Sequence, residues 1–223
     1  MTKKLLTPKD LSPSQVQAYK DILIKKRMCI ASECGWGKSV SCLNAFTILL
    51  KKKPESKGLI VCTPEGVKKT WAVEHTKWSH TNHLKVVPLL GTPKQREKLL
   101  NQDADMYAIS YNSLKWLVEV NKYINFNFVF ADEADCLKGP TSQWRKYLIK
   151  AAPKAKYKIL SSATPKTREE DDYWGLCKYL DNGKSLKAEN ITMFRALYCS
   201  PFMVNNRQIW KIKKTIVLNL CSG

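Results

Sequence analysis

The chain has 223 residues, of which 44% are hydrophobic and 26% are charged, a globular composition that excludes wholesale disorder. It holds 38 Lys and Arg against 19 Asp and Glu, a net charge of +19, which favours a polyanionic partner such as a nucleic acid over a merely soluble basic surface. No apolar run reaches the length of about 18 residues that a membrane span needs, and Met1–Gln15 lacks the apolar core of a signal peptide, so we expect an intracellular protein with no membrane partner.

Short apolar runs alternate with helical periodicity along most of the chain. Apolar runs predict strands at Met28–Ala31, Leu59–Cys62, Val86–Leu90, Met106–Ser110, Phe126–Ala131 and Tyr157–Ser161. Helical spacing predicts helices at 13–27, 38–50, 93–101, 113–123, 142–151 and 169–180, and a helical segment through Val67, Trp71, Glu74 and Trp78. Strands that alternate with helices form a parallel sheet covered on both faces, so the predicted fold class is α/β. From about Asn182 the pattern loosens into an expected tail with a strand at Ile216–Leu220.

The tryptophans and cysteines are expected mostly in the core. Helical spacing with other apolar residues favours burial of four tryptophans: Trp71, Trp78, Trp144 and Trp174. The eight cysteines form no C-x-x-C pair, so the sequence predicts reduced thiols in apolar surroundings rather than a zinc site.

A glycine-containing loop follows the first strand, and a helix begins at Gly37-Lys38-Ser39. A helix N-terminus offers free N–H groups and a positive dipole end to a phosphate, and Gly35 and Gly37 let the backbone approach it closely. Lys38 would reach the β and γ phosphates, and Ser39 would ligate Mg²⁺. Ser32 stands where the G-x-x-x-x-G-K-[ST] pattern has its first glycine, so a structural glycine turn is the alternative interpretation.

Two further strands end in polar residues. Phe128–Ala131 leads into Asp132 and Glu133, where the first carboxylate can hold Mg²⁺ through water and the second can orient and deprotonate an attacking water. Taken alone, the pair could equally be an acidic turn. The strand at Tyr157–Ser161 continues into small hydroxyl residues.

In this order, the three segments resemble motifs I, II and III of superfamily-two helicases, and the chain as a whole is similar to the Swi/Snf-like DNA translocases over about residues 11–220. The further segments that carry the resemblance are Leu11-x-Pro13-x-Gln15, similar to the family's Gln motif; Leu59–Pro64 followed by Trp71, Glu74 and Trp78, similar to motif Ia; Ile109–Tyr111, similar to "ITSYE"; Asp132–Ser142, similar to "DEAHRLKNPxS"; Leu160–Pro165, similar to "LTGTP"; and Pro201–Val204, similar to "PFMLRR".

The resemblance implies a RecA-like P-loop domain that binds ATP, Mg²⁺ and duplex DNA. The nucleotide-binding residues it implies are Gln15, at the adenine, with Gly35, Trp36, Gly37, Lys38 and Ser39. Catalysis would fall to Lys38, Asp132 and Glu133, and the metal to Ser39 and Asp132. The implied DNA contacts are Thr63, Pro64, Ser110, Tyr111 and Lys138, and the residues implied to couple the two sites are Asp135, Ser162, Ala163 and Thr164.

The resemblance also implies a division of the chain. The family's enzymes have two RecA-like lobes, and the motifs of the second lobe, including its arginine finger, have no counterpart here. We therefore expect residues 1–185 to form the ATP-binding lobe and residues 186–223 to form a connector and the start of a second lobe, which a separate chain would supply. Hydrolysis would be weak without it. Two alternatives are a nucleotide-gated binding module without turnover and a basic DNA-binding protein whose nucleotide site is a relic.

Overall fold

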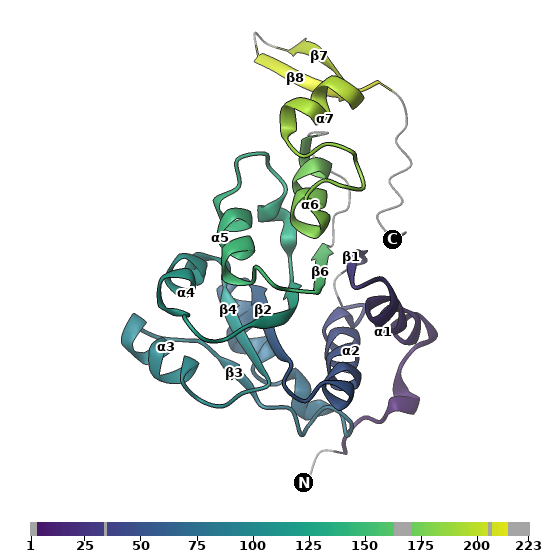
Figure 1. The fold of residues 1–223 in the computed structure, drawn as a ribbon. Helices are drawn as coiled ribbons and strands as arrows, with labels where there is room; N and C mark the ends of the chain where they lie inside the picture. Colours follow the sequence, from purple (N-terminus) through teal and green to yellow (C-terminus); the bar gives the residue numbers. More distant parts are fainter. Residues whose placement is uncertain (1–3, 34, 163–170, 205–206, 214–223) are drawn as a thin grey trace.

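A six-stranded parallel sheet forms the centre of the computed structural model, which describes residues 4–33, 35–162, 171–204 and 207–213 (Figure 1). The strands are β1 (Arg27–Ala31), β2 (Lys57–Cys62), β3 (Val86–Pro88), β4 (Met106–Ser110), β5 (Phe126–Ala131) and β6 (Tyr157–Ser162). Their order across the sheet is β1-β6-β5-β2-β4-β3, and every neighbouring pair is parallel. The predicted α/β class and the six predicted strands are confirmed, because each buried apolar run lies in a strand that is covered on both faces.

Helices cover both faces of this sheet (Figure 1). One face carries α1 (Pro13–Lys25) and α2 (Lys38–Lys52), and the other carries α3 (Pro93–Leu100), α4 (Leu114–Val120), α5 (Gln143–Ala151) and α6 (Asp171–Asp181). Alternate residues of β2 separate the two layers, since Ile60 belongs to the cluster with α2 whereas Leu59 and Val61 belong to the cluster with α4 and α5. This alternation follows from the two-residue period of a strand.

The segment after β2 forms two short helical turns rather than one regular helix. Residues Gly66–Trp71 make a π-helical turn, and Glu74–Lys77 make a 3₁₀ turn. Trp71 and Trp78 are both buried, as expected. π-helical turns are rare and occur frequently at functional sites.

Trp144 and Arg145 of α5 show the opposite burial from the one that their hydrophobicity predicts. Trp144 is 40% exposed, so its expected burial is wrong, whereas Arg145 is only 3% exposed. The Arg145 guanidinium donates to the carbonyl oxygens of residues 137–140, at 2.6–3.1 Å. Helix α5 therefore turns its arginine inward because four backbone acceptors there need donors.

The expected tail after Asn182 is wrong. Helix α7 (Ile191–Tyr198) leads into an antiparallel hairpin of β7 (Cys199–Val204) and β8 (Arg207–Ile212), which lie beyond α6 at one end of the molecule (Figure 1). Buried side chains of α6, α7 and the connecting residues make a separate small core: Trp174, Cys177, Leu186, Ala188, Phe194 and Cys199. We call α6, α7, β7 and β8 the C-terminal unit. The strand expected at Ile216–Leu220 lies outside the described residues, and the division at residue 185 stays a prediction.

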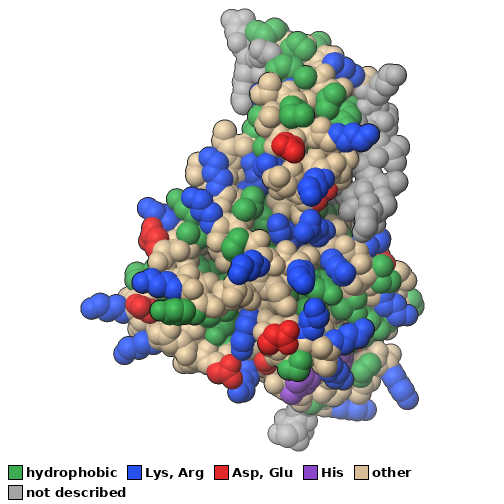
Figure 2. All heavy atoms as spheres, in the orientation of Figure 1, with side chains coloured by type: hydrophobic (Ala, Val, Ile, Leu, Met, Phe, Trp, Pro, Cys, Tyr) green, Lys and Arg blue, Asp and Glu red, His purple; other side chains and the backbone are tan. Residues whose placement is uncertain are grey.

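In the part of the chain that the structure describes, no helix combines the length and the hydrophobicity that crossing a membrane requires. On the face shown in Figure 2, Lys and Arg side chains outnumber Asp and Glu side chains and are spread over the whole surface rather than gathered in one stripe.

Candidate functional site

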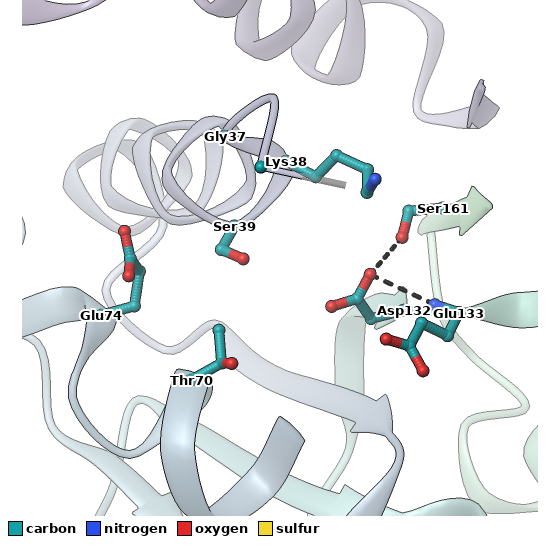
Figure 3. Close-up of a pocket in the computed structure, with 9 residues that line it drawn as sticks. Gly37, Lys38, Ser39, Thr70, Glu74, Asp132, Glu133 and Ser161 are labelled. Atoms are coloured by element: carbon teal, nitrogen blue, oxygen red, sulfur yellow. Dashed lines mark hydrogen bonds between the residues drawn. The ribbon is translucent and has the colours of Figure 1, made fainter. Parts of the chain in front are cut away.

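A cavity of about 320 Å³ lies at the carboxyl edge of the sheet. Three groups of residues line it, from the loop between β1 and α2, from the ends of β5 and β6, and from the turn after β2 (Figure 3). They are Gly35, Gly37, Lys38, Ser39, Asp132, Glu133, Ser161, Thr70 and Glu74. In open parallel sheets, ligands bind beyond the carboxyl ends of the strands, so this edge is the expected place for a site.

The loop before α2 requires glycine at two positions. Gly35 has φ +82° and Gly37 has φ +93°, a left-handed conformation that side chains rarely adopt. A Cβ at residue 37 would also lie 2.1 Å from Nε2 of Gln15. Helix α2 then begins without a side-chain cap and without an acidic residue in its first turn. Its N-terminal dipole is thus left available to an anion.

Lys38 is held against the loop. Its Nζ donates to the carbonyl oxygens of Ser32 and Glu33, at 2.9 Å each. The neighbouring Ser32 Oγ is buried and has no hydrogen-bond partner among the described residues. The ammonium group therefore stands at the cavity wall on bonds that an anionic ligand can replace.

Gln15 links α1 to this loop. Its Oε1 accepts from the N–H of Ser12 at 2.9 Å, in a capping box that begins α1, and its Nε2 donates to the carbonyl of Trp36 at 3.0 Å. The side chain thus fixes the position of the loop. Gln15 and Trp36 do not line the cavity itself, although both lie beside it.

Asp132 is fixed by donors on both of its carboxylate oxygens. Oδ1 accepts from Ser161 Oγ and, at 3.2 Å, from the N–H of Glu133, as Figure 3 shows. Oδ2 accepts from the indole Nε1 of Trp71 at 3.3 Å. Glu133 is exposed, with a left-handed backbone at φ +51°. Residues other than glycine that adopt this conformation cluster at functional sites.

The next turn brings together three of the residues that the sequence assigned to coupling and DNA contact. Asp135 Oδ1 accepts from Ser162 Oγ at 3.0 Å and forms an ion pair with Lys138. The Lys138 side chain is only 8% exposed, so its ammonium group lies inside this turn and not on the surface where a DNA contact was expected. The other two expected coupling residues, Ala163 and Thr164, lie outside the described residues.

Of the other four residues expected at DNA, three are accessible at the surface and one is buried. Thr63, Pro64 and Ser110 follow β2 and end β4 at the carboxyl edge, where they are exposed or half-buried. Tyr111 is buried instead, and its hydroxyl donates to the carbonyl of Asp132 at 2.8 Å. Burial raises the pKa of Tyr111 well above its usual range, so the hydroxyl stays a donor. Tyr111 therefore acts on the backbone of the acidic pair.

Three residues of the cavity were not predicted as site residues: Thr70, Glu74 and Ser161. Glu74 accepts from Lys77 Nζ at 2.6 Å and from Trp78 Nε1 at 3.4 Å. A signal was present, because a carboxylate among apolar residues at helical spacing has to face either solvent or a site. Periodicity alone does not distinguish these two places.

The residues present fit a nucleoside triphosphate with Mg²⁺. The uncapped N-terminus of α2 and Lys38 supply positive charge, while Ser39 and Asp132 supply the oxygen ligands that Mg²⁺ prefers. Gly35 has no atom within 4 Å of an added Cβ, so the loop borders open space. Within the described residues, no group of three or more His, Cys, Asp or Glu side chains forms a ready-made metal cage.

Comparisons with known proteins agree with this geometry. A family model described as "SNF2-related domain" matches residues 14–220. A curated phage protein, "Putative protein p41" of Acyrthosiphon pisum secondary endosymbiont phage 1, is 31% identical over 193 residues, which cover 82% of this chain and 41% of the phage protein. The DNA repair and recombination protein RAD54B of Gallus gallus is 24% identical over 179 residues, 78% of this chain and 19% of that protein.

A solved structure has the same fold. The Sulfolobus solfataricus SWI2/SNF2 ATPase core in complex with dsDNA superposes with a TM-score of 0.72 and 21% identity, over 85% of this chain and 39% of that chain. This chain therefore spans less than half the length of each of these three proteins.

Proposed function

Because this chain belongs to the SNF2-related domain family and corresponds to the N-terminal lobe of its ATPase core, we propose that its cavity binds ATP with Mg²⁺ and that the lobe serves a DNA-dependent translocase. One observation supports the proposal most: Lys38 and Ser39 from the first turn of α2 line the same cavity as Asp132 and Glu133 from the end of β5. A duplex-DNA partner implies that the protein acts inside a cell.

Each residue of the cavity has a distinct proposed role. Lys38 exchanges the Ser32 and Glu33 carbonyls for the β and γ phosphates, and Ser39 and Asp132 hold the metal. Bound Mg²⁺ would offset charge on the phosphoryl oxygens. Glu133 orients a water and accepts its proton, while Gln15 holds the loop and faces the adenine.

Duplex DNA is the proposed partner at the carboxyl edge of the sheet. Thr63, Pro64 and Ser110 remain the candidates for backbone contact, since Tyr111 and Lys138 are buried. The net charge of +19 supplies a sequence-independent attraction to phosphate. The Sulfolobus solfataricus relative was solved with dsDNA, which supports this choice of partner.

Turnover is proposed to need a second lobe. The transition state of phosphoryl transfer spreads negative charge over three oxygens. Among the described residues that line the cavity, Lys38 alone carries a positive charge. An arginine finger, supplied in cis or by a partner protein, accelerates related P-loop enzymes about 10³–10⁵-fold. We therefore expect residues 1–223 by themselves to bind ATP and to hydrolyse it slowly.

The nucleotide proposal is tested by thermal unfolding with and without Mg²⁺–ATP. A ligand that binds only the folded state raises the melting temperature, and Lys38→Ala should remove that rise. Lys51→Ala is the matched control, because Lys51 is exposed at the other end of α2. An unchanged rise in Lys38→Ala would contradict the phosphate assignment.

Turnover and DNA binding need separate assays. With a cognate second lobe added, Glu133→Gln should keep ATP binding and lose DNA-stimulated hydrolysis.

Affinity for duplex DNA should fall with salt at a log–log slope of about −0.9 per phosphate neutralised. ATP binding without turnover even with the second lobe would favour the nucleotide-gated module. Salt-dependent DNA binding without any nucleotide effect would favour the relic site.

A further inference from the structure

Trp71 lies between the apolar layer of α2 and the acidic pair. Its side chain is 1% exposed, and its ring contacts Phe130 of β5 at a centroid distance of 5.3 Å. Phe130 lies in β5, two residues before Asp132. The indole thus contacts the strand that leads into Asp132.

The N–H group of that indole points away from the apolar core and toward Asp132. Nε1–H of Trp71 donates to Oδ2 of Asp132 at 3.3 Å. The hydrogen bonds at Oδ1 come from Ser161 and from the backbone of Glu133, on the opposite side of the carboxylate. Donors on both oxygens restrict rotation of the carboxylate about its Cβ–Cγ bond. Removing the indole donor frees one side of it.

We propose that Trp71 is a positioning residue for the metal site, which orients the Asp132 carboxylate toward the ion through its indole N–H. The inference rests on the proposed binding of Mg²⁺–ATP. Groups that hydrogen-bond to metal ligands fix their orientation, and their loss typically lowers metal affinity about 10–100-fold. Trp71 is the last residue of the π-helical turn Gly66–Trp71.

The segment that carries Trp71 lies between the proposed DNA contact and the proposed metal site. The same turn begins beside Thr63, whose Oγ1 accepts from the N–H of Gly66 at 3.2 Å. Thr70, the residue before Trp71, lines the cavity. One short segment therefore runs from the proposed DNA contact to the metal ligand.

The test measures binding of a fluorescent N-methylanthraniloyl ATP to the full chain while Mg²⁺ is titrated. Trp71→Phe keeps an aromatic ring and removes the donor. It should raise the Mg²⁺ concentration at half-maximal binding about tenfold or more, while the weaker binding measured in EDTA stays unchanged. A purely structural role would lower both together with the folded fraction.

Trp174→Phe is the matched control. Trp174 is also buried, at 6% exposed, and its Nε1 donates to the Ala188 carbonyl at 3.0 Å, away from the cavity. Trp174→Phe removes the same ring volume and a comparable hydrogen bond. The Mg²⁺ concentration at its half-maximal binding should therefore equal that of the wild type.

A volume-preserving replacement keeps the test decisive if Trp71→Phe does not fold. Site-specific incorporation of 3-benzothienylalanine at residue 71 replaces N–H by sulfur and keeps the ring size. An unchanged Mg²⁺ midpoint in this variant would overturn the positioning role while the wild type still binds Mg²⁺–ATP. Failure of the wild type to show any Mg²⁺-dependent binding would overturn the proposed function and this inference together.

Discussion

The carboxyl edge of the sheet and the C-terminal unit hold their polar atoms in different ways. At the edge, Asp132 and Asp135 accept from side chains of other elements. In the C-terminal unit, the hydroxyl of Tyr198 and the indole of Trp174 donate to backbone carbonyls. The groups of the edge are charged, including Lys38 on its two loop carbonyls, and they can exchange partners when a ligand arrives. The two donors of the C-terminal unit are neutral and stabilise one backbone shape. The first arrangement suits the binding proposed for this edge, and the second suits packing.

Arg145 connects these two regions. Its guanidinium donates to the loop that follows Asp135 and lies 5.2 Å from the ring centroid of Trp174 in the C-terminal unit. Variants within one region should therefore leave the other unchanged, and a variant that affects both would show that the two regions are coupled.

The largest expected effects come from the two cores. Phe130→Ala and Phe194→Ala each remove a fully buried ring, which costs about 3–5 kcal/mol of unfolding free energy. We expect Phe130→Ala to weaken Mg²⁺–ATP binding as well, because the ring contacts Trp71, and Phe194→Ala to leave it unchanged. Urea unfolding and nucleotide titration measure the two quantities. Equal losses of affinity would show that the regions are not separable.

Arg145→Ala should lower the free energy of unfolding by about 3 kcal/mol, because it leaves buried carbonyl oxygens without donors. Arg145→Lys should recover only part of this, since an ammonium group has three donors and lacks the planar fork. Unlike either phenylalanine variant, Arg145→Ala should increase amide hydrogen exchange both in residues 137–140 and in α6. Increased exchange in only one of them would contradict its connecting role.

Gly37→Ala should act on the site alone. The left-handed backbone costs alanine about 1–2 kcal/mol, and the added Cβ overlaps Gln15. We expect roughly tenfold weaker Mg²⁺–ATP binding, which corresponds to about 1.4 kcal/mol. Gly139→Ala is the control, because nothing lies within 4 Å of its added Cβ. Isothermal calorimetry distinguishes the two, and a matching loss in Gly139→Ala would rule out the steric explanation.

The smallest expected effect is on thiol reactivity. Burial raises the pKa of Cys136, beside the acidic pair, and of Cys177, in the C-terminal unit, from 9.0 to about 12. Unfolded thiols lose their protons first, so the unfolding free energy should fall as the pH rises from about 9 to 12. At pH 8, iodoacetamide should label both slowly, and Phe194→Ala should accelerate only Cys177. Mass spectrometry gives the two rates.

Most of the sheet could be predicted because its strands are buried on both faces. The predicted strands at Met106–Ser110 and Phe126–Ala131 match β4 and β5 to the residue. The hairpin of β7 and β8 could not be found in the same way, since the apolar run of β7 is short and β8 mixes polar with apolar residues. Phe202 and Met203 of β7 are exposed, so burial in a sheet does not account for their hydrophobicity.

Within the site, the sequence could indicate which residue types meet but not which side chains turn inward. The adjacent carboxylates and the glycine loop were predicted from strand ends, and they share one cavity. Lys138 and Tyr111 were expected at DNA because the resemblance to the Swi/Snf-like translocases implies contacts at these positions. Their burial depends on the partners Asp135 and Asp132, which only the tertiary fold brings into reach.

Gly175 allows α6 to pack directly against the turn that follows Asp135. It lies inside α6, where glycine weakens a helix by about 1 kcal/mol relative to alanine, and an added Cβ would lie 1.6 Å from the carbonyl oxygen of Lys138. No larger side chain fits there unless one of the two backbones moves, so this glycine sets how closely α6 packs on the backbone of Lys138, three residues after Asp135.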